Sequence, residues 1–164
     1  MPSISDPDWV VRRAVERDRT SCLEIVTRLA DFFTADVPEH VQSDMASHRS
    51  WVIAQDDAVV GFAVVARRGR LAAEILWVAV AGDRRGEHFG TRLVDQVLEE
   101  LRVDGVKIVE VKTLDASAGY EPYTATRAFW AARGFVQLDT IDPLPGWQPG
   151  NPAAILAAAL GPTR

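Results

Sequence analysis

The residues best suited to chemistry lie in one short segment that carries neighbouring arginines and two closely spaced glycines. The segment reads Asp83-Arg84-Arg85-Gly86-Glu87-His88-Phe89-Gly90-Thr91. If a helix begins within it, the first N–H groups of that helix have no partners and carry the positive end of the helix dipole. Glycines let a ligand approach the backbone closely, so the segment predicts a phosphate or pyrophosphate site. An ordinary turn with solvated arginines is the alternative.

The spacing of the glycines argues against two common nucleotide-binding motifs. No Gly-Lys-Ser or Gly-Lys-Thr follows the segment, so it is not a P-loop. Gly86 and Gly90 lie four residues apart, whereas the dinucleotide fingerprint has glycines at its first, third and sixth positions. The predicted anion site therefore belongs to a different class of protein.

Glu74 is the candidate proton acceptor. It lies in an apolar run with Ala73, Ile75 and Leu76, which predicts a desolvated carboxylate whose pKa is raised towards neutral pH. A glutamate that faces solvent from an alternating strand is the alternative. Three scattered histidines and one cysteine predict no metal site. The cysteine, Cys22, shares a helical face with apolar residues, which favours a small buried group over a catalytic thiol.

These residues must be positioned by a mixed α/β domain. The Ser21–Glu24 spacing predicts a capping box that opens a first helix, and Pro38 suits the first turn of a second. The four-residue repeat from Phe89 predicts a third helix that ends at Gly105, and a fourth ends at Gly134. Alternating or β-branched runs predict strands at 9–14, 51–55, 59–67, 71–80, 106–113, 135–140 and 153–160.

The order of these elements defines the expected sheet. The strands at 71–80 and 106–113 are joined through a helix, which requires them to run parallel. The other neighbours are expected to be antiparallel. The sequence thus predicts a single domain over residues 1–164, with a mostly antiparallel sheet of about seven strands, one parallel pair and four flanking helices.

Composition limits the function classes. The chain has 164 residues, 48% of them hydrophobic, and a formal net charge of −5. A basic face for nucleic acid is therefore not expected. The longest apolar run is far shorter than the roughly 20 residues that a membrane span needs. With one cysteine and no signal-like N-terminus, we expect a cytoplasmic protein that binds neither nucleic acid nor membrane.

The anion segment and the element order together resemble the GNAT superfamily of acetyl-CoA-dependent N-acetyltransferases. The family's loop reads Arg or Gln, two residues, Gly, one residue, then Gly or Ala, after a strand that ends in alternating valines. Val78, Val80, Arg85 and Gly90 match that pattern, while His88 replaces the middle glycine. The segments at 120–127 and 147–152 are similar to a bacterial GNAT subgroup without an assigned acceptor.

The resemblance implies a site and a co-substrate. It implies that the backbone at Val78 and Val80 pairs with the pantetheine arm of acetyl-CoA, in a cleft where the strand at 71–80 splays from the strand at 106–113. Glu74 corresponds to the general base of the histone-acetyltransferase branch, although the likeness does not establish a histone acceptor. The amides expected to hold the pyrophosphate belong to Arg85, Gly86, Glu87, His88, Phe89, Gly90 and Thr91.

The proton donor departs from the family pattern. The family places a tyrosine four residues before Gly134-Phe135, but this chain has Trp130 there. Tyr123 or Tyr120 is an alternative donor, with a packed loop tyrosine as the plainer interpretation; the thiolate can also leave unaided. Trp77, Trp130 and Trp147 either line an acceptor pocket or, as scattered tryptophans usually do, fill the core.

The leading hypothesis is therefore transfer of an acetyl group from acetyl-CoA, without a metal, to the primary amine of a small molecule or peptide. A non-catalytic acyl-CoA sensor on the same fold is the alternative, motivated by Trp130 and opposed by the retained Glu74. A third hypothesis is an assembly subunit, such as a homodimer, that pairs through its last strand.

Overall fold

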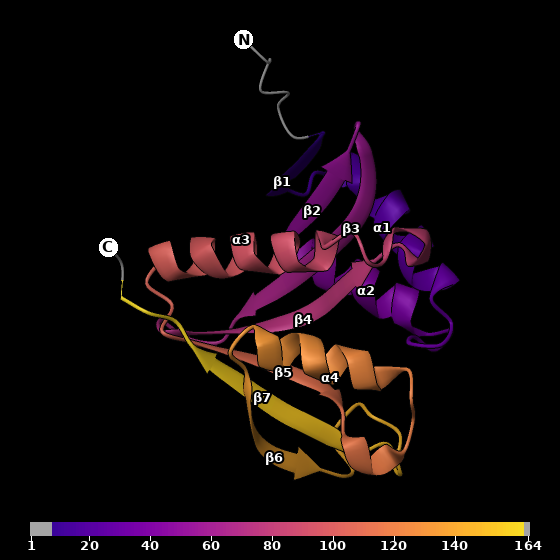
Figure 1. Ribbon diagram of the computed structural model, residues 1–164, viewed down its shortest axis with the longest axis vertical. Helices are drawn as coiled ribbons and strands as arrows, with labels where there is room; N and C mark the ends of the chain where they lie inside the picture. The colour runs from indigo at the N-terminus through magenta and orange to yellow at the C-terminus, as the bar shows by residue number, and fades with distance from the viewer. Residues whose placement is uncertain (1–7, 163–164) are drawn as a thin grey trace. The chain divides into compact units, whose positions relative to one another are not determined.

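The computed structural model describes residues 8–162 of the chain (Figure 1). Its strands are β1 (Trp9–Arg13), β2 (Arg49–Gln55), β3 (Ala58–Arg67), β4 (Ala72–Val80), β5 (Ile108–Leu114), β6 (Val136–Ile141) and β7 (Ala153–Ala159). Its helices are α1 (Arg19–Arg28), α2 (Val37–Ser47), α3 (Phe89–Val103) and α4 (Tyr123–Ala132). Short 3-10 turns are η1 (Glu16–Asp18), η2 (Gly82–Arg84) and η3 (Ala116–Ala118).

The strands form one seven-stranded sheet in the order β1-β2-β3-β4-β5-β7-β6. β1 with β2, β2 with β3, β5 with β7 and β6 with β7 are antiparallel, whereas β4 and β5 are parallel. The predicted mixed sheet with one parallel pair and four helices is confirmed. The expectation that the last strand is free to pair with a partner is wrong, because β7 lies between β5 and β6 and it is β6 that forms the edge.

By its internal contacts the chain divides into two compact units. The first comprises residues up to Val65 together with Trp77–Val97, and the second comprises Ala66–Leu76 together with the residues from Leu98 onward. Strand β4 and helix α3 each contribute residues to both units. The candidate cofactor loop belongs to the first unit, while Glu74 and Tyr123 belong to the second.

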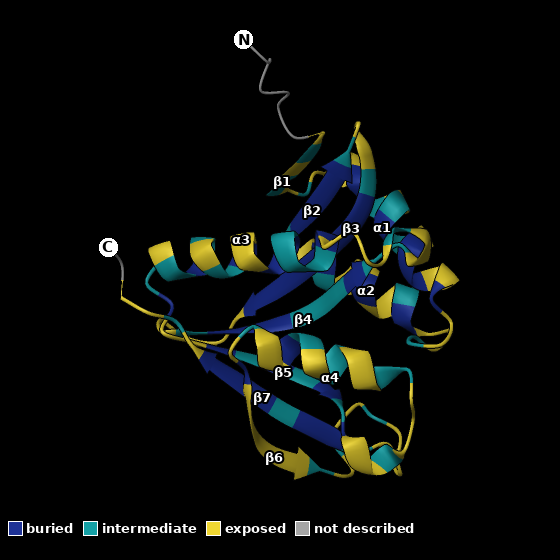
Figure 2. Cartoon of the chain, in the orientation of Figure 1, coloured by how far each residue is buried: buried dark blue, intermediate teal, exposed yellow. Residues whose placement is uncertain are grey.

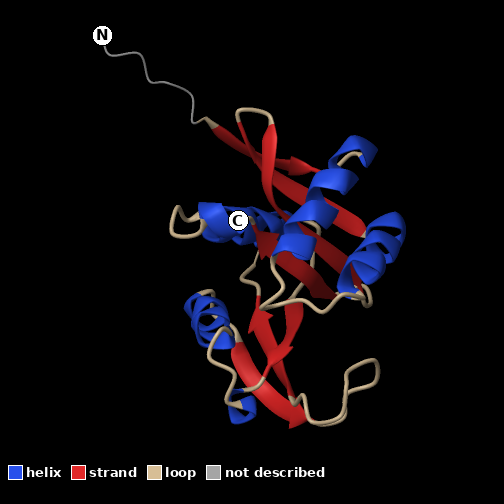
Figure 3. Ribbon diagram, turned by 90° about the vertical axis from the view of Figure 1, so that its right-hand side faces the viewer, coloured by secondary structure: helices blue, strands red, loops and turns tan. Residues whose placement is uncertain are grey.

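The core of the first unit is built on β2 and β3. Residues 51–54 and 60–65 are buried without alternation, which requires cover on both faces of the strands (Figure 2). Helices α1 and α2 pack together on one side, and the first turns of α3 lie on the other (Figure 3). The two strands are joined through Asp56 and Asp57, whose φ angles of 49° and 66° suit the tight hairpin turn that the sequence predicts.

Helix α1 begins at Arg19, two residues before the predicted capping box, so the assignment of Ser21 as N-cap is wrong. The cause is a tertiary contact. Arg12 of β1 donates two hydrogen bonds to the Asp18 carboxylate, at 2.7 and 2.9 Å, and the Val15 N–H donates a third at 2.8 Å. The turn η1 is thereby fixed and the helix starts directly behind it.

The second unit is built on β5, β7 and β6, with α4 packed against β5. The Asp115 carboxylate links its loops: it accepts hydrogen bonds from the Ser117 N–H at 3.0 Å, the Ser117 hydroxyl at 2.6 Å and the Gln137 amide at 2.8 Å. The Asp115 N–H donates in turn to the Pro152 carbonyl. Strand β6, by contrast, is exposed along nearly its whole length (Figure 2).

Candidate functional site

The predicted anion segment connects β4 to α3 within the first unit. After β4, the turn η2 leads into residues 85–88, and α3 starts at Phe89. Gly86 and His88 both have left-handed backbones, with φ angles of 86° and 64°. No heavy atom lies within 4 Å of the place where a Cβ on Gly86 would sit, so its backbone is open to approach. The segment thus has the form of an open loop ahead of a helix N-terminus.

His88 has a left-handed backbone, a conformation that glycine adopts without strain. A left-handed conformation costs a side-chain-bearing residue about 1–2 kcal/mol, although histidine tolerates it better than most residues. The position where the resemblance expects a glycine thus holds a histidine with a left-handed backbone. The loop places its strain next to the helix start, where a bound anion can offset it.

The N-terminus of α3 supplies the positive end of a long helix. The Arg92 N–H donates to the His88 carbonyl at 3.1 Å, which begins the helical ladder. The N–H groups of Phe89, Gly90 and Thr91 precede that first bond and have no partner within the helix. Phe89 itself is 2% exposed, so its ring anchors the helix start in the core. The first turn of α3 is therefore fixed and available to an anion.

Neighbouring aromatic rings and one carboxylate contact the arginines of the segment, Arg84 and Arg85, and Arg92, which follows it. The Arg85 guanidinium lies 4.4 Å from the centre of the Phe32 ring, and that of Arg92 lies 4.7 Å from the Trp9 ring. Arg84 forms a long ion pair with Glu87, at 3.5 Å. Cation–π contacts at exposed sites are worth about 0.5–1 kcal/mol, so these side chains can swing to a phosphate at little cost.

Strand β4 pairs with β5 only over its first four residues. The paired residues run from Ala72 with Ile108 to Ile75 with Val111. Val78 and Val80 follow further along β4 and are half-buried. Neither residue belongs to the part of β4 that pairs with β5.

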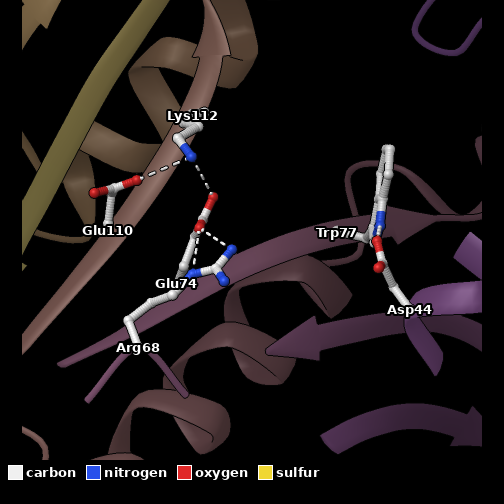
Figure 4. A network of polar contacts seen from close by, with 6 residues as sticks. All are labelled: Asp44, Arg68, Glu74, Trp77, Glu110 and Lys112. Atoms are coloured by element: carbon white, nitrogen blue, oxygen red, sulfur yellow. Dashed lines mark hydrogen bonds and ion pairs between the residues drawn. The ribbon is translucent and has the colours of Figure 1, made fainter. Parts of the chain in front are cut away.

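Glu74 is 5% exposed, which argues against the solvent-facing alternative. Its surroundings are nonetheless not the apolar ones that the sequence suggests. Oε2 accepts hydrogen bonds from Arg68, from Nε at 2.9 Å and from Nη2 at 2.7 Å. Oε1 pairs with Nζ of Lys112 at 3.0 Å (Figure 4). Each oxygen of the Glu74 carboxylate thus contacts a cation.

Sequence reasoning missed the partners of Glu74. Arg68 comes from the turn before β4 and Lys112 from β5, where Lys112 also contacts Glu110 at 3.3 Å. A signal was available: Glu110 and Lys112 are two residues apart, which places both on one face of a strand parallel to the strand of Glu74. All four residues belong to the second unit.

Tyr123 is the first residue of α4 and is half-buried. Burial and the neighbouring Tyr120, whose ring centre lies 6.1 Å away, raise the pKa of Tyr123, so its phenol keeps its proton at neutral pH. Trp130 is 5% exposed and makes edge-to-face contacts with Phe129 and Phe135. The core interpretation of Trp130 is the one that the structure supports.

The remaining candidates have structural surroundings. The Trp77 indole donates to the Asp44 carboxylate of α2 at 2.7 Å and so ties β4 to that helix (Figure 4). Trp147 is half-buried in the β6–β7 loop. Cys22 is fully buried, and burial raises the pKa of its thiol to about 12, which makes it inert as a nucleophile. Within residues 8–162, no helix is long and apolar enough to cross a bilayer.

Comparison with known proteins identifies the class. The sequence profile of the acetyltransferase (GNAT) family matches residues 14–135, which is most of the chain. The chain therefore belongs to the GNAT acetyltransferase family. A search of curated protein sequences gives no match.

Solved structures share the fold at low sequence identity. The ribosomal-protein-S18-alanine N-acetyltransferase from Escherichia coli is 16% identical, with a TM-score of 0.76 over 95% of this chain and 96% of that one. A GNAT family acetyltransferase from Elizabethkingia anophelis with acetyl-CoA bound is 14% identical, with a TM-score of 0.72 over 94% of this chain and 100% of that one. An aminoglycoside 6'-N-acetyltransferase complexed with coenzyme A is 17% identical, with a TM-score of 0.72 over 94% and 99%.

Proposed function

We propose that this chain transfers an acetyl group from acetyl-CoA to a primary amine by direct attack of the amine on the thioester. The observation that carries the proposal is the open loop ahead of α3, with left-handed Gly86 and His88 before the fixed first turn of the helix. A helix N-terminus of this form suits a pyrophosphate. Membership of the GNAT family supports the same co-substrate.

The co-substrate residues follow from this assignment. The amides from Arg85 to Thr91 hold the pyrophosphate, and the backbone of Val78 and Val80 pairs with the pantetheine arm as an added strand would. The arginines near the loop leave their aromatic neighbours and screen the phosphate charge. The acceptor is a small molecule or a peptide; both kinds are named among structures of the same fold.

Glu74 is the proposed base. An acceptor ammonium must lose a proton before its nitrogen can attack, and Glu74 is a buried carboxylate on the strand that leads to Val78 and Val80. Because Arg68 and Lys112 both contact the Glu74 carboxylate, an acceptor ammonium reaches it by displacing one of these cations. Lys112 is the cation that can yield, since Glu110 lies 3.3 Å away as a second partner.

Tyr123 is the proposed candidate for the proton donor, in a secondary role. Its phenol carries a proton at neutral pH, as any tyrosine does, and its raised pKa makes it a weaker proton donor than an ordinary tyrosine. The family's donor position holds Trp130, whose indole is packed in the core and does not protonate a thiolate. Departure of the CoA thiolate without a donor is the simpler course, because a thiol of ordinary pKa is a tolerable leaving group.

The experiment that tests the function combines binding with turnover. Acetyl-CoA is titrated into the protein by calorimetry, and release of free CoA thiol is then followed with a panel of primary amines. Binding together with amine-dependent CoA release supports the transferase. Binding of acetyl-CoA without release of CoA thiol in the presence of any amine favours the alternative, a non-catalytic acyl-CoA sensor. The packed Trp130 and the fully paired Glu74 motivate this alternative.

A homodimer is a further part of the proposal, now through β6 instead of β7. β6 is an edge strand, with Val136 at 64% and Leu138 at 66% exposure. An exposed apolar edge favours pairing with a second strand. Sizing chromatography of the wild type and of Leu138→Lys tests this: a dimer that dissociates in the variant supports it, and a wild-type monomer contradicts it.

A further inference from the structure

One of the two cations that contact Glu74, the proposed base, is itself a primary amine, the side chain of Lys112. Nζ of Lys112 lies 3.0 Å from Oε1 of Glu74, where an acceptor ammonium would have to be held for its proton to be removed (Figure 4). The Lys112 side chain is 31% exposed, so it is only partly withdrawn from solvent. Glu74 and Lys112 lie in the same compact unit, the second.

The lysine content of the chain makes this contact unusual. The sequence contains two lysines, Lys107 and Lys112, against sixteen arginines. Lys107 is exposed and lies just before β5, outside the Glu74 cluster. Lys112 is thus the lysine that contacts Glu74. Lys107, five residues earlier, serves as a control within the same chain.

We propose that Lys112 is an internal acceptor, acetylated on Nζ by the same protein. This inference rests on the proposed function, since it needs acetyl-CoA to deliver its thioester to Glu74. The Lys112 ammonium gives a proton to Glu74, and the freed nitrogen lone pair attacks the thioester carbon. The C–N bond forms, the C–S bond breaks, the nitrogen loses its second proton, and the departing CoA thiolate takes that proton up. The products are acetyl-Lys112, free CoA and one proton released to solvent.

The reaction is expected to be slow and to stop after one turnover. Burial would lower the pKa of Lys112, but hydrogen bonds and charges from Glu74 and Glu110 outweigh it and the pKa is raised. Most Lys112 therefore carries its proton at neutral pH. The position beside the base compensates, because holding a nucleophile in place is worth many orders of magnitude in effective concentration.

Acetylation would also change the site. An acetylated Lys112 has no positive charge, so Glu74 keeps Arg68 as its cation and Glu110 loses its ion pair. One cation fewer would then contact Glu74 when an external acceptor ammonium binds. The modified protein is accordingly expected to turn over external amines faster than the unmodified one.

The test follows acetylation of the full chain by intact mass and peptide mapping after incubation with acetyl-CoA. We expect one acetyl group on Lys112, none in Lys112→Arg, and unchanged modification of Lys112 in the matched control Lys107→Arg. In Glu74→Gln the rate should fall at least about 100-fold, the lower range for loss of a general base. A chain unfolded in urea gives the rate at which free lysines react without the fold.

The outcomes separate the inference from the function on which it rests. Modification of Lys107 as fast as Lys112, or equal rates for Lys112 in the folded and unfolded chains, is ordinary chemical acetylation and overturns the inference. A protein that binds acetyl-CoA and acetylates external amines but leaves Lys112 unmodified overturns the inference alone. A protein that does not bind acetyl-CoA overturns both. The comparison of the two lysines needs no variant, so it stands even if Glu74→Gln does not fold.

Discussion

Replacing Glu74 by glutamine separates the structural from the chemical role of this carboxylate. Glutamine keeps the shape of the side chain and one acceptor oxygen, but it removes the charge that holds Arg68 and Lys112. In the folded protein Glu74 is 5% exposed and accepts two hydrogen bonds from Arg68 besides its pair with Lys112. The variant therefore changes both the free energy of unfolding and the rate of acetyl transfer.

The size of the stability effect follows from the exposure of the partners. Breaking a buried ion pair costs about 3–5 kcal/mol when one charge is left without compensation. Here the Arg68 side chain is 51% exposed and that of Lys112 is 31% exposed, so water can solvate both after the substitution. We therefore expect a loss of about 1–2 kcal/mol in the free energy of unfolding, a value between those typical of exposed and of buried ion pairs.

The catalytic effect should be much larger than the stability effect. General-base catalysis contributes about 10²–10⁴-fold, so turnover should fall by that range while the affinity for acetyl-CoA stays near wild type. Urea unfolding, calorimetry and CoA-thiol release measure the three quantities.

The matched control is Glu110→Gln, which removes the other carboxylate on Lys112. Glu110 is 41% exposed and 3.3 Å from Lys112, so its loss should change stability by less than about 0.5 kcal/mol and leave turnover near the wild-type rate. If Glu74→Gln turns over at the wild-type rate across the pH range, Glu74 is structural and the reasoning is refuted. An equal loss of activity in both variants would also count against a specific role for Glu74.

Two further predictions concern the second unit. Tyr123→Phe should lower turnover by less than about tenfold, under 1.4 kcal/mol, because thiolate departure needs no donor; a hundredfold drop at unchanged acetyl-CoA affinity would assign the acid to Tyr123. Asp115→Asn should lower stability by about 1–2 kcal/mol at neutral pH. Hydrogen bonds from Ser117 and Gln137 lower the pKa of Asp115 to about 2, below its unfolded value near 3.9. That stabilisation is present above about pH 4 and is lost as the pH falls towards 2, so urea midpoints of variant and wild type should converge there; a constant gap would contradict this.

Local patterns predicted the elements well wherever the chain itself determines them. The hairpin at Asp56-Asp57 and the helix ends before Gly105 and Gly134 follow from residues that suit a left-handed backbone, and the structure has them there. The strands of the core were found because continuous burial selects β-branched runs. The loop before α3 was predicted because its glycines and the start of the helix are adjacent in the sequence.

Errors arose where a distant residue decides the local structure. The start of α1 was misplaced because Arg12, in β1, binds Asp18 and fixes the turn before the helix. Glu74 was expected among apolar neighbours because its flanking residues in the sequence are apolar. Its actual partners are Arg68, which lies in a turn, and Lys112, which lies in a strand 38 positions later. The pattern of residues within β4 does not predict either partner.

The central claim is that the loop from Arg85 to Thr91 binds the pyrophosphate of acetyl-CoA, and calorimetric titration of Gly90→Val tests it most directly. Gly90 is the second residue of α3, where a β-branched side chain would stand between the ligand and the first N–H groups. The matched control is Gly69→Val, since a Cβ at Gly69 would meet no atom within 4 Å. We expect wild-type affinity in the control and at least tenfold weaker binding in folded Gly90→Val, about 1.4 kcal/mol. Unchanged affinity in a folded Gly90→Val would contradict the assignment of the loop and, with it, the proposed function.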